Sequence, residues 1–88
     1  MEDAAGIRAG DQEAFRLLVE RHSHALFRLA YRMTGNEHDA EDVVQEALVK
    51  AYRGLDRFEE RAEVGTWLYR ITSNCAFDLL RSRQRRGR

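Results

Sequence analysis

Apolar residues recur at steps of three and four positions along most of the chain, which is the spacing of one face of an α-helix. The first such segment begins near Asp11, a residue suited to cap a helix, and ends before Gly35, which suits the turn after one. Asn36 can cap the next helix directly, so the two helices are expected to pack antiparallel. The apolar positions of the first segment, with one histidine among them, are Phe15, Leu18, Val19, His22, Leu26, Leu29, Ala30 and Met33.

A second apolar stripe follows Asn36, and Gly54 weakens this helix near its end. An acidic, polar loop is expected over residues 59–65, and Leu55 and Phe58 lead into it. The apolar stripe consists of Ala40, Val43, Val44, Ala47, Leu48, Ala51 and Tyr52. The other side of the same helix carries Glu41, Asp42, Gln45, Glu46, Val49 and Arg53.

A third helix is predicted from about Val64 or Thr66 to the low eighties. No segment alternates between apolar and polar residues with period two, so no strand is expected. The inner stripe of this helix consists of Leu68, Ile71, Cys75 and Leu79. A different face, again at steps of three and four, carries Arg70, Asn74, Phe77, Arg81 and Arg85.

These patterns predict an all-α fold, a small bundle of three main helices in which an antiparallel hairpin packs against a long third helix. Residues 1–10 could add a short helix at the start. One domain is expected over residues 11–83, with residues 84–88 beginning a linker, because 88 residues leave no room for a second domain. The predicted core consists of Phe15, Leu18, Leu26, Leu29, Val43, Val44, Ala47, Leu48, Trp67, Leu68, Ile71 and Cys75.

The positive and negative charges of the chain are equal in number but unevenly distributed along the sequence. Fifteen Lys and Arg residues balance fifteen Asp and Glu residues. Residues 1–46 carry ten acids and five bases, whereas residues 81–88 carry five arginines and no acid. An acidic block and a basic end indicate two partners of opposite charge, although solvated helix faces and a frayed tail would give the same pattern.

Residues suited to catalysis are scarce. The chain has no glycine-rich phosphate loop, and its three histidines lack the spacing of a metal site. Cys75 is the single cysteine, which excludes an internal disulfide and fits a reducing, cytoplasmic setting. The longest uncharged stretch, Ile71–Phe77, is too short to span a membrane. We therefore expect no enzymatic activity, cofactor, metal or membrane partner.

The third predicted helix has the composition of a nucleic-acid-binding element. It combines Trp67, Tyr69 and Phe77 with Arg70, Asn74 and the closing arginines. Arginine contacts phosphates, asparagine can bond an adenine edge, and aromatic rings stack on unpaired bases. Trp67 taken alone is better explained as a core residue, since it adjoins an inner position.

Three segments, residues 10–36, 39–52 and 66–86, resemble a known family. The stretch DAEDVVQEALVKAY (39–52), followed by TWLYRITSNCAFDLLRSRQRR (66–86), resembles region two of bacterial extracytoplasmic-function (ECF) sigma factors. The stretches GDQEAFRLLVERH (10–22) and LFRLAYRMTGN (26–36) resemble the first conserved segment of that family. The resemblance covers nearly the whole chain, with its motifs in the family's order and spacing.

The resemblance implies a domain that docks on the β′ coiled coil of core RNA polymerase and recognises and melts the minus-ten promoter element. Melting would proceed by capture of a flipped base of the non-template strand, without nucleotide hydrolysis. The implied polymerase-binding residues are Asp39, Glu41, Asp42, Gln45, Glu46 and Val49. The implied DNA-binding residues are Phe58, Glu59, Glu60, Arg61, Ala62, Glu63, Arg70, Asn74, Arg81, Arg83, Arg85 and Arg86.

The chain departs from the family's pattern in two places. The loop EERAEVG (59–65) replaces the usual Gly, Ser, Phe and basic residues, and its glutamates should repel a DNA backbone. The second helical domain, which in the family reads the minus-thirty-five element, is absent, so we expect an isolated domain. The expected state is a cytoplasmic monomer, and an anti-sigma factor is a candidate regulator.

Two alternative hypotheses can be compared with the sequence. A helical protein-interaction adaptor with an incidental basic tail would show no sequence preference on any oligonucleotide. A helix-turn-helix binder of duplex DNA is disfavoured, because an acidic loop of about seven residues precedes the third helix instead of a tight turn.

Overall fold

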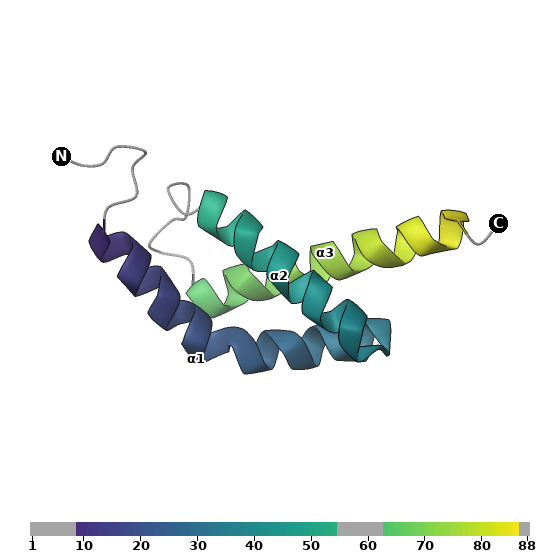
Figure 1. Ribbon diagram of the computed structural model, residues 1–88, viewed down its shortest axis with the longest axis horizontal. Coiled ribbons are helices and arrows are strands. Elements are labelled where there is room, and N and C mark those ends of the chain that lie inside the picture. The colour runs from purple at the N-terminus through teal and green to yellow at the C-terminus, as the bar shows by residue number, and fades with distance from the viewer. Residues whose placement is uncertain (1–8, 55–62, 87–88) are drawn as a thin grey trace.

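A computed structural model describes residues 9–54 and 63–86 and shows three helices (Figure 1). Helix α1 spans Ala9–Thr34, α2 spans Glu37–Arg53 and α3 spans Val64–Arg86. No strand occurs in the described part of the chain. The predicted all-α bundle of a hairpin and a long third helix is confirmed, although α3 continues past the expected boundary at residue 84.

The turn between α1 and α2 has the form that the sequence predicts. Gly35 adopts a left-handed backbone with φ of +70°, and its N–H donates to the carbonyl of Tyr31 at 2.7 Å. The Oδ1 of Asn36 accepts a hydrogen bond from the N–H of Asp39 at 2.9 Å, which caps α2. These two residues end one helix and begin the next, so α1 and α2 form a hairpin.

Gly35→Ala is expected to lower the free energy of unfolding by about 1 kcal/mol, because a Cβ disfavours positive φ. No atom lies within 4 Å of the position that this Cβ would take, so backbone strain alone sets the loss. Denaturant unfolding measures the change, and Gly35→Asn serves as the control with a smaller loss, since asparagine tolerates this conformation. Equal stability of the alanine variant and the parent would contradict a strained turn.

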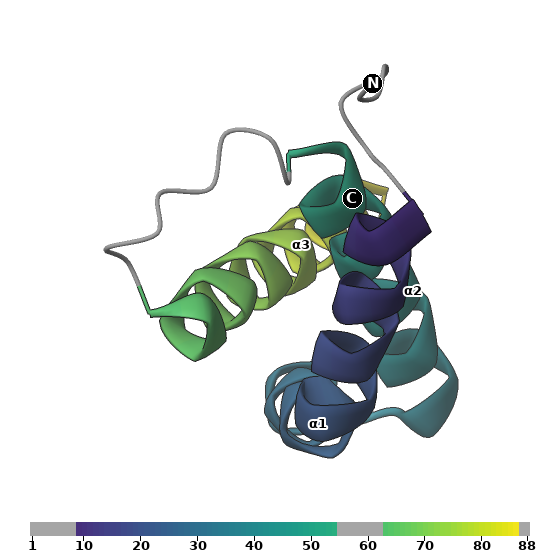
Figure 2. The same ribbon diagram turned by 90° about the vertical axis from the view of Figure 1, so that its left-hand side faces the viewer.

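The core forms where α3 lies against the hairpin, as the end-on view shows (Figure 2). One cluster of buried residues joins Ala30 of α1, three residues of α2 and two of α3: Ala40, Val43, Ala47, Cys75 and Ala76. A second cluster joins Leu26, Ala51 and Leu68, one residue from each helix. Because alanine supplies so many of these contacts, the helix backbones can approach closely.

Most of the predicted core residues lie in or against these clusters. Leu26, Leu29, Val43, Ala47, Leu68 and Cys75 are buried. Phe15, Val44, Leu48, Trp67 and Ile71 are partly buried and pack against the clusters. Leu18 is half-buried. Thr72 is fully buried without having been predicted, and its hydroxyl donates to the carbonyl of Leu68 at 2.8 Å, so its polar group is satisfied.

Candidate functional site

The outward face of α3 carries the arginine, asparagine and aromatic side chains that the sequence places together. Arg70, Asn74, Phe77 and Arg81 follow at steps of three and four, and all four are exposed. Phe77 is 51% exposed, which is high for a large apolar side chain. The Arg81 guanidinium pairs with Asp78 one turn earlier. Arg85 and Arg86 extend the basic character through the last turn of α3.

A cavity of about 320 Å³ opens between the end of α2 and the first half of α3. It is lined by Lys50 and Gly54 of α2 and by Trp67, Ile71 and Asn74 of α3. Trp67 also packs against the core cluster of Leu26, Ala51 and Leu68, so it both belongs to the core and lines the cavity. An amide, an aromatic ring and an ammonium group around one opening suit a nucleotide base and its phosphate.

Lys50 is the lining residue that the sequence reasoning missed. The signal that could have found it is its place one helical turn before Gly54, where α2 ends beside α3. Its Nζ lies 3.4 Å from Oε2 of Glu46. The pKa of Lys50 is raised, first by the Cys75 sulfur and then by Glu46, so the side chain is cationic at neutral pH.

Cys75 is buried in the core and is not among the residues that line the cavity. Burial raises the pKa of its thiol, so the group is protonated at neutral pH and is a poor nucleophile. A thiolate charge at Cys75 therefore arises only in alkaline solution, and at neutral pH Glu46 is the anion paired with Lys50.

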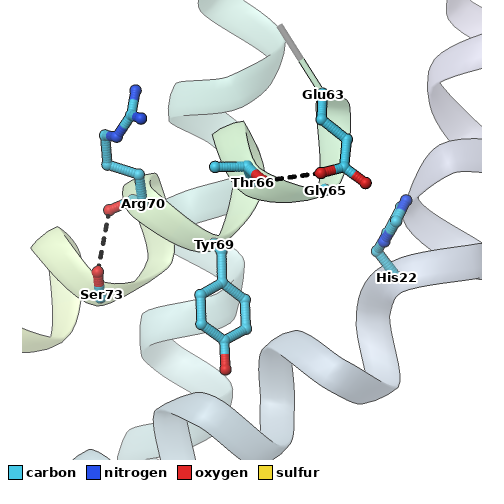
Figure 3. Close-up of a pocket in the computed structure, with 7 residues that line it drawn as sticks. All are labelled: His22, Glu63, Gly65, Thr66, Tyr69, Arg70 and Ser73. Carbon is cyan, nitrogen blue, oxygen red and sulfur yellow. Dashed lines mark hydrogen bonds between the residues drawn. The ribbon is translucent and has the colours of Figure 1, made fainter.

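A second open cavity, of about 490 Å³, lies between α1 and the first turns of α3 (Figure 3). It is lined by His22 of α1 and by Glu63, Gly65, Thr66, Tyr69, Arg70 and Ser73. Tyr69 points toward α1, whereas the Arg70 side chain points away from it. A Cβ on Gly65 would lie 3.2 Å from Cε1 of His22, so this close approach of α3 to α1 favours glycine. Arg70 therefore lines this second cavity, whereas Asn74 lines the first cavity together with Lys50.

The acidic face of α2, which we define as Glu41, Asp42, Gln45, Glu46 and Val49, is exposed to solvent. Val49 is 48% exposed and gives the face an apolar edge. Asp42 lies 3.6 Å from Nε2 of His38, and Glu46 pairs with Lys50 as described. Carboxylates beside one apolar side chain suit a partner rich in arginine.

Asp39, which the family resemblance groups with the polymerase-binding residues, is buried and lies apart from this exposed face. Its side chain is 4% exposed and faces Arg83 of α3. Nη2 of Arg83 donates to Oδ1 of Asp39 at 2.5 Å, and Nη1 contacts Oδ2. The physical reason is that a buried carboxylate needs a cationic partner, which the end of α3 supplies. The same pairing engages Arg83, one of the arginines expected to contact phosphates, and its contact with DNA stays a prediction.

The loop to which the family resemblance assigns base capture falls largely outside the described residues. Phe58, Glu59, Glu60, Arg61 and Ala62 lie outside the described residues, and their roles stay predictions. Glu63 is exposed at the start of α3, where its carbonyl accepts from the N–H of Trp67 at 3.1 Å. The Oε1 of Glu63 accepts a hydrogen bond from the Thr66 hydroxyl at 3.0 Å, so this carboxylate is bonded to the first turn of α3.

Across residues 9–54 and 63–86, no helix has both the length and the apolar character needed to cross a membrane. Over the same residues, no group of three or more His, Cys, Asp or Glu side chains could hold a metal ion.

Residues 18–86 match the profile of sigma-70 region 2. The chain belongs to this family. Its region 2 sequence is 41% identical over 78 residues to the ECF RNA polymerase sigma factor SigW of Bacillus subtilis (strain 168). It is 46% identical over 80 residues to the ECF RNA polymerase sigma-E factor of Escherichia coli (strain K12). The alignments cover 89% and 91% of this chain but only 42% and 41% of the two relatives.

A solved structure is also similar to this region 2 domain. It is an NMR structure of the complex formed by an engineered region 2 of sigmaE with GTAAAA. The TM-score is 0.80 at 48% identity, and the match covers 88% of this chain and 80% of the other. The ECF resemblance drawn from residues 10–36, 39–52 and 66–86 is thereby confirmed. The relatives are named as RNA polymerase sigma factors, which are initiation factors and not enzymes, in agreement with the expectation of no enzymatic activity.

Proposed function

We propose that this domain recognises the minus-ten element of a bacterial promoter as single-stranded DNA and captures a flipped base of the non-template strand. We further propose that it binds the β′ coiled coil of core RNA polymerase through the acidic face of α2. Both activities would take place on the polymerase, in the cytoplasm. An anti-sigma partner and a monomeric state stay predictions.

The observation that carries the DNA part is the juxtaposition of Asn74, Trp67 and Lys50 around one cavity. Asn74 can bond a base edge, and the Trp67 ring offers an apolar wall. Lys50 supplies a cation for a phosphate beside the base, and the exposed Arg70 adds another next to Asn74. The similar solved structure, at 48% identity, holds the hexamer GTAAAA, which supports a single-stranded ligand of this kind.

Promoter opening by such a surface requires no reaction at a side chain. Removing one base from the stack costs a few kcal/mol. Stacking on an aromatic ring returns about 1–3 kcal/mol per base. Contacts between arginines and the phosphates of the open strand supply the remainder. The domain would thus trap DNA that has opened, while the polymerase makes the bonds of the transcript.

The polymerase part is supported by the charge and exposure of α2. Its acidic face presents three carboxylates to solvent beside Val49, and no arginine of the chain is seen paired with Glu41, Asp42 or Glu46 among the described residues. Complementary charge across such a face favours rapid and specific docking of a cationic partner helix.

Asn74→Ala is expected to weaken binding of single-stranded GTAAAA by about five- to thirtyfold, because one amide contact with a base edge is worth about 1–2 kcal/mol. Binding of a scrambled hexamer of the same composition should change by less than about twofold, since phosphate contacts remain. Fluorescence anisotropy with labelled hexamers measures both affinities.

Ser73→Ala is the matched control for this experiment. Its hydroxyl donates to the carbonyl of Arg70 at 3.3 Å, so the change removes a polar group next to Asn74 without reaching its cavity. Equal losses of Asn74→Ala on both hexamers would reduce Asn74 to a structural residue. A parent domain that binds both hexamers equally would favour the helical adaptor instead.

A further inference from the structure

Glu46 and Lys50 form an ion pair that joins the two surfaces of the proposed function. They lie one helical turn apart on α2, with Nζ and Oε2 at 3.4 Å. Glu46 belongs to the acidic face, whereas Lys50 lines the cavity that Asn74 shares. Both side chains remain about half exposed, at 56% and 49%, so each is also accessible to an outside partner.

Among the groups that interact with Lys50, Glu46 is the main anion paired with it at neutral pH. Cys75 is a neutral thiol at neutral pH, because burial raises its pKa. Asp78 raises the pKa of Lys50 less than Glu46 does, and it is already paired with Arg81. The ammonium group of Lys50 is thus paired with Glu46, so the Glu46 carboxylate competes with any phosphate at the cavity for this one cation.

We propose that Glu46 is a positioning residue that holds Lys50 away from DNA until a cationic side chain of the polymerase binds Glu46. The inference rests on the proposed function, since it requires both partners. When an arginine of the polymerase pairs with the Glu46 carboxylate, Lys50 becomes free to contact a DNA phosphate. The same pairing neutralises Glu46, so the repulsion between its carboxylate and that phosphate falls. By linkage, DNA bound to Lys50 would strengthen polymerase binding by the same factor.

The size of the coupling follows from the exposure of the pair. Solvent-exposed ion pairs are weak, so releasing Lys50 is expected to raise DNA affinity by about two- to fivefold. Such a factor would favour DNA binding by the assembled polymerase complex over binding by the free domain.

The first arm of the test uses the free domain and single-stranded GTAAAA at low salt. Glu46→Gln should raise the affinity by about two- to fivefold. Asp42→Asn is the matched control, because it removes the same charge from the same face but its carboxylate faces His38. Its gain should be clearly smaller. In a Lys50→Met background, Glu46→Gln should give no gain, since the cation that it releases is gone.

The second arm repeats the DNA titration with core polymerase at a saturating concentration. There the parent and Glu46→Gln should bind GTAAAA equally, because the polymerase already occupies Glu46. A gain for Glu46→Gln that matches the Asp42→Asn gain, that persists in the Lys50→Met background, or that survives with core present would overturn the link. A parent domain without preference for GTAAAA over its scrambled form would instead overturn the proposed function itself.

Discussion

Arg83→Met is expected to lower the free energy of unfolding by about 2–3 kcal/mol, because it leaves the buried Asp39 carboxylate without its partner. Breaking a fully buried pair costs more, but Arg83 is 49% exposed and its side of the pair reaches water. Methionine keeps the length and apolar stem of the arginine, so the change isolates the charge. Chemical denaturation followed by circular dichroism measures the difference.

The controls for this prediction lie on the same helix and on the partner residue. Arg85→Met removes an exposed arginine from the same last turn and should change stability by less than about 0.5 kcal/mol. Adding Asp39→Asn to Arg83→Met should recover part of the loss, since it removes the stranded charge. If Arg83→Met is no more destabilising than Arg85→Met, the pair has no structural role in solution.

Reversing two charges of the acidic face, with Glu41→Arg and Asp42→Arg together, is expected to weaken core polymerase binding by about 100-fold. Each reversal replaces an attraction with a repulsion toward a cationic partner, and like-charge contacts at an interface cost several kcal/mol. Both side chains are exposed, so the helix should remain folded. Binding of labelled domain to core polymerase, at several salt concentrations, measures the loss.

The matched control reverses two acids on another helix. Glu13→Arg with Glu20→Arg changes the net charge by the same amount on the exposed side of α1, where both acids pair with Arg16. This variant should bind core polymerase with nearly the parent affinity. If the two double variants lose affinity equally, net charge alone governs docking, and the acidic face of α2 is not the polymerase-binding surface.

Local signals in the sequence predict the helices and the hairpin well. Gly35 and Asn36 act within their own turn, through a positive φ and a cap, so their roles depend on nothing distant. The apolar stripes likewise identify Val43, Leu68 and Cys75 as inward-facing residues, and all three are buried. Periodicity is a property of each helix alone, which is why it can be read directly.

The site depends on contacts that no local pattern encodes. Asp39 sits among acids at the start of α2, and only the end of α3, 44 residues later, makes it a buried partner of Arg83. In the sequence, Lys50 is indistinguishable from the other charged residues of its helix. Only the packing of α2 on α3 brings it to the same cavity as Asn74. Thr72 is polar by type, yet its hydroxyl bonds back to its own helix and allows full burial.

The pairing of Arg83 with Asp39 also bears on counterion release, which drives much of the affinity of proteins for nucleic acids. An arginine that neutralises a phosphate releases close to one condensed cation, so the arginines of residues 81–88 suggest a large effect. Arg81 can exchange its exposed partner Asp78 for a phosphate at little cost. Arg83 cannot do so without stranding a buried carboxylate. The arginine-rich end therefore contributes fewer released ions than its composition implies, because one of its charges holds α3 to α2.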